Sequence, residues 1–219
     1  MKDRAKRGMA AGVGLVLVFV LWTILIQCVD VRPVGQNGTN IGFATVNVWF
    51  HQLTGVHMAI YTVTDWLGLV PILICLCFGA IGLIQLIQRR SLKKVDPDLL
   101  LLGVYYILVI LAYLIFEMIP INYRPVLIDG ALEASYPSST TLLVLSVLPT
   151  LVFQVNRRVS NAAVRAVACG FAVLFSAFMV VGRLVCGVHW LTDIAGAVFL
   201  SAGLYLIYRS AVLWMDGKK

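Results

Sequence analysis

The sequence predicts an all-α, polytopic membrane protein with six transmembrane helices and one short interfacial amphipathic helix. The first observation is composition, since 61% of the 219 residues are hydrophobic and only 12% are charged, with a mean hydropathy of +0.95. A soluble domain is roughly half apolar and a quarter charged, so a water-soluble globule and a disordered chain are excluded. The other two observations are six long apolar runs and the uneven placement of Lys and Arg.

The six apolar runs define the predicted spans of a single integral membrane domain, residues 1–219. A bilayer core about 30 Å thick is crossed by about 20 helical residues. The runs that reach this length are Met9–Val29, Leu67–Ile87, Leu99–Ile119, Ser138–Val155, Ala162–Val181 and Trp190–Tyr208. The first is longer than the apolar region of a signal peptide and lacks an A-x-A site after it, so we expect a retained anchor. Pro71 predicts a kink in the second span.

The segment Ile41–Gly55, between the first two spans, has a different pattern. Its apolar residues recur at helical spacing with polar residues between them: Phe43, Val46, Phe50 and Leu53 alternate with Asn47, His51 and Gln52. This pattern predicts an amphipathic helix lying in the membrane interface. We assign His51 and His57 to packing at that interface. Asp65 is expected to be an interfacial polar residue, with the rim of a cavity as the alternative.

The basic residues predict the orientation of the spans. Of the 17 Lys and Arg residues, 14 flank the spans on one side: Lys2, Arg4, Lys6, Arg7, Arg89, Arg90, Lys93, Lys94, Arg157, Arg158, Arg165, Arg209, Lys218 and Lys219. Only Arg32, Arg124 and Arg183 fall on the other side. The positive-inside rule then places both termini in the cytoplasm, in what we expect to be a bacterial cytoplasmic membrane. The net charge of +7 therefore reports topology, and no nucleic-acid partner is expected.

Polar residues that suit an anion gather at one end of the predicted spans. Arg124 follows the third span and Arg183 ends the fifth, while His189 and Asp193 open the sixth. The i,i+4 spacing of His189 and Asp193 puts them on one helix face, within reach of a hydrogen bond. Arg side chains bind phosphate oxygens in pairs, and a neutral His oriented by a carboxylate can attack phosphorus.

Hydroxyl groups at the start of the fourth span complete this set. Ser138, Ser139 and Thr140 begin that helix, where free backbone N–H groups and the helix dipole favour an anion. Each group also has an ordinary structural explanation: an Arg can anchor at the interface, a Ser can cap a helix, and a His–Asp pair can be structural. Their convergence at one membrane face favours a phosphate site.

The run that ends the fifth span and opens the sixth resembles the third signature of the type 2 phosphatidic acid phosphatase family. Arg183, His189 and Asp193 have the spacing of that signature, and Gly182 stands where it has Ser. Pro137-Ser138-Ser139-Thr140 resembles its second signature, Pro-Ser-Gly-His. Arg124-Pro125 resembles the end of the first signature, which is Lys, six residues, then Arg-Pro.

The resemblance covers about residues 99–208 and implies six spans with one active site at a membrane face. It implies that His189 is the nucleophile that forms a phosphohistidine and that Asp193 orients it. Arg124, Arg183, Ser138 and the backbone at Ser139 would bind phosphate. The resemblance implies no metal or cofactor. The five cysteines form no ligand framework, and we expect all five in the core.

Two departures from the family signatures bear on substrate choice. Glu117 occupies the position of the first-signature Lys, and Thr140 that of the second-signature His, which in the family is the general acid. A lipid alkoxide needs a proton to leave, whereas a phosphate does not. We therefore expect an enzyme with an extracytoplasmic site that acts on a lipid phosphate or, preferably, an isoprenyl-type lipid diphosphate. The alternative is a non-catalytic relative that binds phospholipid head groups.

Overall fold

The computed structural model describes residues 2–217, and its regular structure is helical. The α-helices are α1 (Lys2–Cys28), α2 (Ala44–Thr54), α3 (Met58–Leu67), α4 (Leu69–Arg89), α5 (Pro97–Met118), α6 (Ser139–Arg158), α7 (Ala162–Val185) and α8 (Leu191–Asp216). Two single turns of 3₁₀-helix, Gln36–Gly38 and Leu92–Lys94, lie in loops. Over residues 2–217 the extended backbone forms only isolated bridges and no strand. The predicted all-α fold class is confirmed.

Six helical stretches are long and apolar enough to cross a bilayer, as predicted. The second span differs most from its expected bounds, because α3 and α4 form one stretch that begins at Met58, nine residues before the predicted start. The bend falls at Gly68, between α3 and α4. Pro71 explains this position, since its ring displaces the carbonyl four residues earlier, at Leu67, and it offers no N–H in return. The other predicted spans differ from the observed helices mainly by extra terminal turns.

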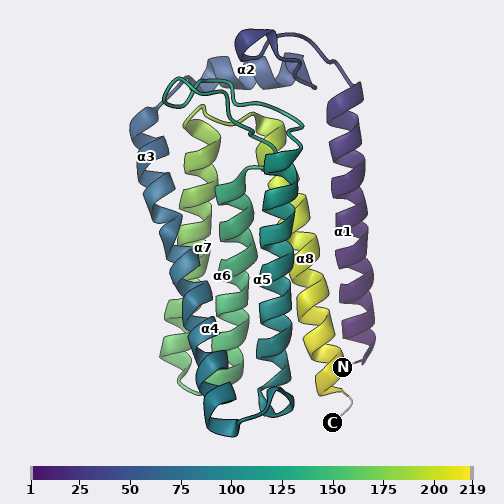
Figure 1. Cartoon of the computed structure of the whole chain (residues 1–219), viewed down its shortest axis with the longest axis vertical. Coiled ribbons are helices and arrows are strands. Elements are labelled where there is room, and N and C mark those ends of the chain that lie inside the picture. Colours follow the sequence, from purple (N-terminus) through teal and green to yellow (C-terminus); the bar gives the residue numbers. More distant parts are fainter. Residues whose placement is uncertain (1, 218–219) are drawn as a thin grey trace.

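The helices α6 and α8 form the centre of the bundle. In each, half of the most apolar stretch is buried inside the protein, against at most 22% in the other four spans. Both also contain more Ser and Thr than any of the other four spans, and their hydropathy is lower. The four more apolar spans surround them (Figure 1) and present exposed Leu, Ile and Val to the bilayer.

The first helix packs mainly against the last one. Gly8 and Gly12 of α1 meet Ser210 and Gly203 of α8 so closely that a Cβ on Gly12 would lie 2.9 Å from the Gly203 carbonyl oxygen. A small residue every fourth position allows two membrane helices to bring their backbones together. This contact closes the bundle and leaves the described ends of the chain at the same end of the molecule (Figure 1).

The predicted amphipathic helix is present as α2 and lies across the opposite end of the bundle (Figure 1). The polar side chains of α2 contact the protein beneath the helix, whereas we expected His51 to pack at the membrane interface. His51 Nε2 lies 3.1 Å from the carbonyl oxygen of Gly187, and Asn47 is buried against Thr192, with its Nδ2 3.0 Å from Oγ1. His57 is exposed and bonded to the Thr54 carbonyl oxygen, as expected of an interfacial residue.

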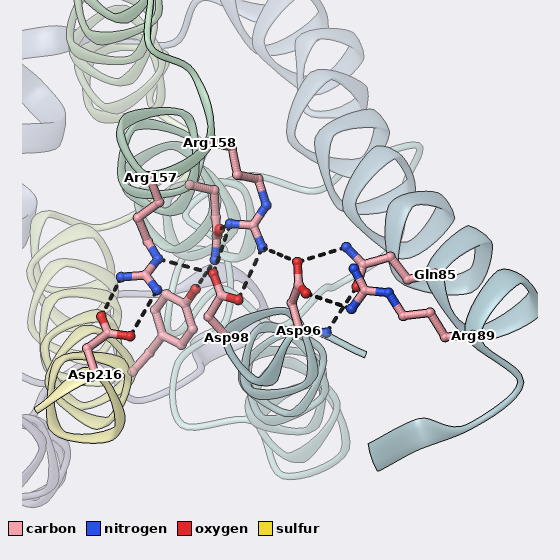
Figure 2. A network of polar contacts seen from close by, with 9 residues as sticks. Gln85, Arg89, Asp96, Asp98, Arg157, Arg158 and Asp216 are labelled. Atoms are coloured by element: carbon pink, nitrogen blue, oxygen red, sulfur yellow. Dashed lines mark hydrogen bonds and ion pairs between the residues drawn. The ribbon is translucent and has the colours of Figure 1, made fainter. Parts of the chain in front are cut away.

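A polar network ties four helical segments together near the chain termini (Figure 2). Carboxylates and guanidinium groups alternate along it in the order Asp216, Arg157, Asp98, Arg158, Asp96 and Arg89, joined by contacts of 2.6–3.7 Å. Asp96 and Asp98 begin α5 while Arg157 and Arg158 end α6, so each charge also matches the dipole of its own helix. Lys218 and Lys219, predicted for this side, lie outside the described residues.

The cysteines do not share one environment, contrary to the expectation that all five lie in the core. Cys186 alone is fully buried and Cys75 half-buried, whereas Cys28, Cys77 and Cys169 are exposed on the outside of the helices. In a membrane protein a small apolar side chain is as stable against lipid as in the core, so hydropathy does not separate the two positions.

Candidate active site

The predicted site residues meet at the end of the bundle that α2 covers. Two loops and two helix ends supply them: the α5–α6 loop carries Arg124, the α7–α8 loop carries His189, and Arg183 and Thr140 lie near the ends of α7 and α6. All four side chains are at least nine-tenths buried. Residues far apart in the sequence therefore come together, as the sequence predicts.

His189 is held with one ring nitrogen fixed and the other free to react. Its Nδ1 lies 3.1 Å from the carbonyl oxygen of Ser135, which can only accept, so Nδ1 carries the proton. Nε2 then carries the lone pair, which accepts a hydrogen bond from Arg124 Nη1 at 3.5 Å. Burial lowers the pKa of His189 to about 4, and the charges of Arg124 and Arg183 act in the same direction while Asp193 opposes them. The imidazole is therefore neutral at pH 7.

Asp193 supports His189 from behind but less directly than the i,i+4 spacing predicts. Its Oδ2 lies 3.7 Å from His189 Nδ1, beyond hydrogen-bond distance. The same oxygen accepts a hydrogen bond from the Trp190 N–H at 2.9 Å, and Oδ1 accepts one from Asn122 Nδ2 at 3.2 Å. Asp193 thus fixes the loop that carries His189 and places a negative charge near the ring.

The two arginines both contact one aromatic ring. The guanidinium carbons of Arg183 and Arg124 are 4.9 Å and 5.8 Å from the centre of the Tyr61 ring, close enough for cation–π attraction. The Nε atoms of both arginines are buried and without a hydrogen-bond partner among the described residues. Two adjacent guanidinium groups with unused donors form a site that an anion can fill.

Each arginine also contacts a carboxylate that is much more exposed than itself. Arg183 Nη2 lies 3.3 Å from Asp65 Oδ1 and donates to Thr140 Oγ1 at 2.7 Å. Arg124 Nε lies 3.0 Å from Glu133 Oε2, although off the direction needed for a hydrogen bond. Asp65 therefore lies at the rim of the site, which was the alternative for this residue.

The start of α6 supplies backbone donors, as expected. The N–H groups of Ser139, Thr140 and Thr141 have no acceptor among the described residues, as is usual for the first turn of a helix. Ser138 is placed differently. Its N–H donates to the Asp193 carbonyl oxygen and its hydroxyl to Thr141 Oγ1 at 3.1 Å.

Glu117 stands apart from the other predicted site residues. It lies in the last turn of α5, is exposed, and forms no ion pair within residues 2–217. The carboxylate that contacts Arg124 is Glu133, in the loop that follows. Sequence reasoning passed over Glu133 and Tyr61 because neither belongs to a signature. The one available signal was the i,i+4 spacing of Tyr61 and Asp65, which places both on the same face of α3.

Gly182, which stands where the signature has Ser, has a physical explanation. A Cβ there would lie 2.7 Å from Thr64 Cγ2 and 3.6 Å from Ile60 Cγ2, so the missing side chain makes room for α3. Thr64 in turn lies 3.4 Å from Arg183 Nη1 through its hydroxyl. The glycine thus lets α3 dock on α7 and reach the site.

The loop of His189 is also held from outside. Gly187 has a φ of +73°, and a Cβ there would lie 2.0 Å from the Gly55 carbonyl oxygen. The His57 N–H donates to the Cys186 carbonyl oxygen at 2.9 Å. The segment that joins α2 to α3 therefore holds this loop in place.

An apolar groove of about 570 Å³ begins beside the site and runs between α4, α5 and α6. Asp65, Ser139 and Thr140 line it together with residues deeper in the bundle, including Cys75 and Val147. Its shape and lining suit a hydrocarbon chain. In the described part of the chain, no three His, Cys, Asp or Glu side chains come together as ligands for a metal ion.

Comparisons with known proteins agree with this geometry. The model of the PAP2 superfamily matches residues 85–215. The fold is similar to that of a crystal structure described as the first transmembrane PAP2-type phosphatidylglycerolphosphate phosphatase from Bacillus subtilis. That similarity has a TM-score of 0.52 at 18% identity and covers 94% of this chain and 96% of the other. A search of curated proteins gave no match.

Proposed function

Because the chain belongs to the PAP2 superfamily, we propose that this integral membrane protein is a phosphatase that removes the terminal phosphate of a lipid, preferably an isoprenyl-type diphosphate. The observation that carries the proposal is the position of His189 Nε2, whose lone pair accepts a hydrogen bond from a guanidinium nitrogen of Arg124 at 3.5 Å. A nucleophile and an anion-binding group then meet at one point, as phosphoryl transfer requires.

The reaction would proceed in two steps. His189 Nε2 attacks the terminal phosphorus, the bond to the leaving oxygen breaks, and a phosphohistidine forms. Arg124, Arg183 and the N–H groups that open α6 stabilise the charge on the phosphoryl oxygens, while Asp193 stabilises the positive ring. Water then hydrolyses the phosphohistidine and releases inorganic phosphate.

The apolar groove supports a lipid as the substrate. It begins at Ser139 and Thr140, beside the proposed phosphate position, so a substrate with its phosphate on the arginines can lay its chain between α4, α5 and α6. A chain in this groove would cover apolar surface, worth about 0.8 kcal/mol for each buried CH₂. A soluble phosphate ester would gain none of this, which favours lipids over soluble substrates.

Thr140 supports the preference for a diphosphate. It is the residue of α6 that contacts Arg183, and its hydroxyl is too weak an acid to protonate a leaving alkoxide at pH 7. General acid help is commonly worth about 10²–10⁴-fold. A leaving phosphate is already stable as an anion, so a diphosphate loses little by the absence of an acid.

The charge distribution supports a cytoplasmic location for both termini and an extracytoplasmic site, in a bacterial cytoplasmic membrane. In the sequence, 14 Lys and Arg residues flank the spans on the predicted cytoplasmic side and 3 on the other side, and basic loops stay in the cytoplasm. Single cysteines placed beside Arg90 and beside Asp129 test this with a membrane-impermeant thiol reagent on intact cells. Labelling at Asp129 alone is expected, and labelling at Arg90 alone would reverse the orientation.

The activity is tested with purified protein in detergent and a panel of lipid phosphates. Phosphate release is expected from farnesyl diphosphate at a much higher kcat/KM than from phosphatidic acid, and none from His189→Ala. Thr140→His should raise hydrolysis of phosphatidic acid selectively. Tight binding of both lipids with no turnover by the folded parent protein would contradict the proposal and favour a head-group-binding relative.

A further inference from the structure

The second step of the proposed reaction needs a group that accepts a proton from water. Once the phosphoryl group is on His189, water must attack from the side that the leaving group has vacated. In the proposed complex the leaving group lies at the mouth of the apolar groove, which Asp65 and Thr140 line, and both of these residues contact Arg183. The vacated side is therefore that of Arg183. The side chains that hydrogen-bond to Arg183 there are Thr140, Thr64 and Asp65, and among them only Asp65 carries a carboxylate, the group that can accept the proton of a water.

We propose that Asp65 is the general base that activates this water, an inference that rests on the proposed function. Asp65 Oδ1 lies 3.3 Å from Arg183 Nη2, the same nitrogen that donates to Thr140. Its side chain is 57% exposed while that of Arg183 is 1% exposed. The carboxylate therefore reaches both the buried cation and the water outside it, as a base that must exchange protons with solvent requires.

The placement of Asp65 is built into the fold rather than left to a mobile loop. It lies on α3 one turn after Tyr61, whose ring contacts both guanidinium groups. The absence of a side chain at Gly182 lets α3 approach α7, with Thr64 filling the space. Contacts made by Tyr61, Thr64 and Asp65, which share one face of α3, thus hold this face against the arginines.

Glu133 serves as the internal comparison. It is also a half-exposed carboxylate beside a buried arginine, but its arginine is the one that contacts His189. It therefore lies on the side of the nucleophile, from which water cannot attack in line with the phosphorus–nitrogen bond. The two carboxylates should have different kinetic roles despite similar surroundings.

The water oxygen forms a bond to phosphorus as the bond between phosphorus and His189 Nε2 breaks, and the electron pair of the broken bond returns to the imidazole ring. One proton of the water passes to the Asp65 carboxylate, and the other stays on the phosphate. Inorganic phosphate leaves, and Asp65 gives its proton to solvent.

The test follows the phosphorylated protein, using farnesyl diphosphate radiolabelled in its terminal phosphate. In Asp65→Asn, one equivalent of label should transfer to His189 at nearly the parent rate and then be lost about 10²–10³-fold more slowly, the usual effect of removing a general base. Asp65→Glu, which keeps the carboxylate, should recover most of the hydrolysis. Glu133→Gln should show no accumulation of label.

Two results would overturn the inference. If labelled Asp65→Asn lost its phosphate as fast as the parent, another group would be the base. If labelling and hydrolysis slowed equally, or Asp65→Glu were as slow as Asp65→Asn, Asp65 would only position Arg183. Failure of the parent itself to acquire label would instead contradict the proposed function.

Discussion

The two ends of the bundle both hold arginine–carboxylate pairs, but the burial of the partners is reversed. At the terminus end, the carboxylate of Asp98 is 9% exposed and lies between Arg157 and Arg158, which are 29% and 26% exposed. At the site end, Arg183 and Arg124 are 1% and 9% exposed, whereas Asp65 and Glu133 are 57% and 39% exposed. The buried charge is negative at one end and positive at the other.

This difference separates a structural network from the proposed binding site. At the terminus end the buried carboxylate of Asp98 accepts hydrogen bonds from both arginines, and opposite charges alternate along the network (Figure 2). At the site end the cations stay buried with unused donors, and their carboxylates can turn away into solvent. An incoming phosphate can replace exposed partners at little cost, because exposed ion pairs are worth about 0–1 kcal/mol.

Matched Arg→Lys substitutions at the two ends of the bundle give the most direct test of this difference. Arg183→Lys should lower kcat/KM about 10²–10³-fold, because the charge remains but the planar group that serves Thr140 and the phosphate is lost. Arg158→Lys, at the terminus end, should change kcat/KM by no more than about twofold, since the site is distant. Steady-state kinetics on both purified variants decides this, and equal losses would mean that the two ends are coupled.

Stability should show the opposite ranking. Asp98→Asn leaves Arg157 and Arg158 without their shared buried partner, and breaking such a pair costs about 3–5 kcal/mol. Asp65→Asn removes an exposed partner and should cost less than about 1 kcal/mol. Unfolding of both variants in detergent, followed by helix loss against denaturant, measures the difference. A larger loss in Asp65→Asn would refute the argument from burial.

The Tyr61 ring, which both arginines contact, should have a smaller effect on substrate binding. Tyr61→Leu removes the aromatic face, and cation–π attraction of about 1–2 kcal/mol corresponds to a rise in KM of about 5–30-fold. Tyr61→Phe keeps the face and should leave KM nearly unchanged. Comparison of kcat and KM for the two variants isolates this contribution, and a similar loss in Tyr61→Phe would instead assign the role to the hydroxyl.

Acid should act on the site end before the terminus end. An unfolded His titrates near pH 6.5 and the folded His189 has a pKa of about 4, so the unfolded chain binds the extra proton first and stability falls as pH drops from 6.5 to 4. The Arg89 and Gln85 hydrogen bonds lower the pKa of Asp96 below 3.8, so its contribution is lost only at lower pH.

The same pKa predicts that the neutral, reactive form of His189 changes by only about 10% between pH 7 and pH 5, where an ordinary His would lose about 25-fold. With only three histidines in the chain, NMR titration of the ring signals can follow each one. An acid limb of His189 near pH 6.5 would contradict the burial found for it.

The sequence was sufficient for the spans because hydropathy over about 20 residues reports the bilayer itself. It also predicted that Arg124, Arg183 and His189 lie at one end of the bundle, where the structure brings them together, while their roles stay a prediction. It could not reveal Tyr61, Asp65 or Glu133 as partners of the arginines, since these contacts depend on how α3 and the α5–α6 loop pack. The start of the second span was missed because Tyr61, Thr64 and Asp65, which contact the arginines, lower its apparent hydropathy.

The contact of Gly8 and Gly12 with α8 has a consequence for biogenesis. Spans enter the membrane in chain order, so α1 is inserted long before its main partner has been synthesised. Throughout that interval its small-residue face must meet lipid or the insertion machinery. The bundle can close only after α8 has been inserted. A chain that ends before α8 still contains the His189 loop but leaves α1 without its main packing partner. The unpaired α1 is a feature by which cellular quality control can distinguish such a chain from a complete one.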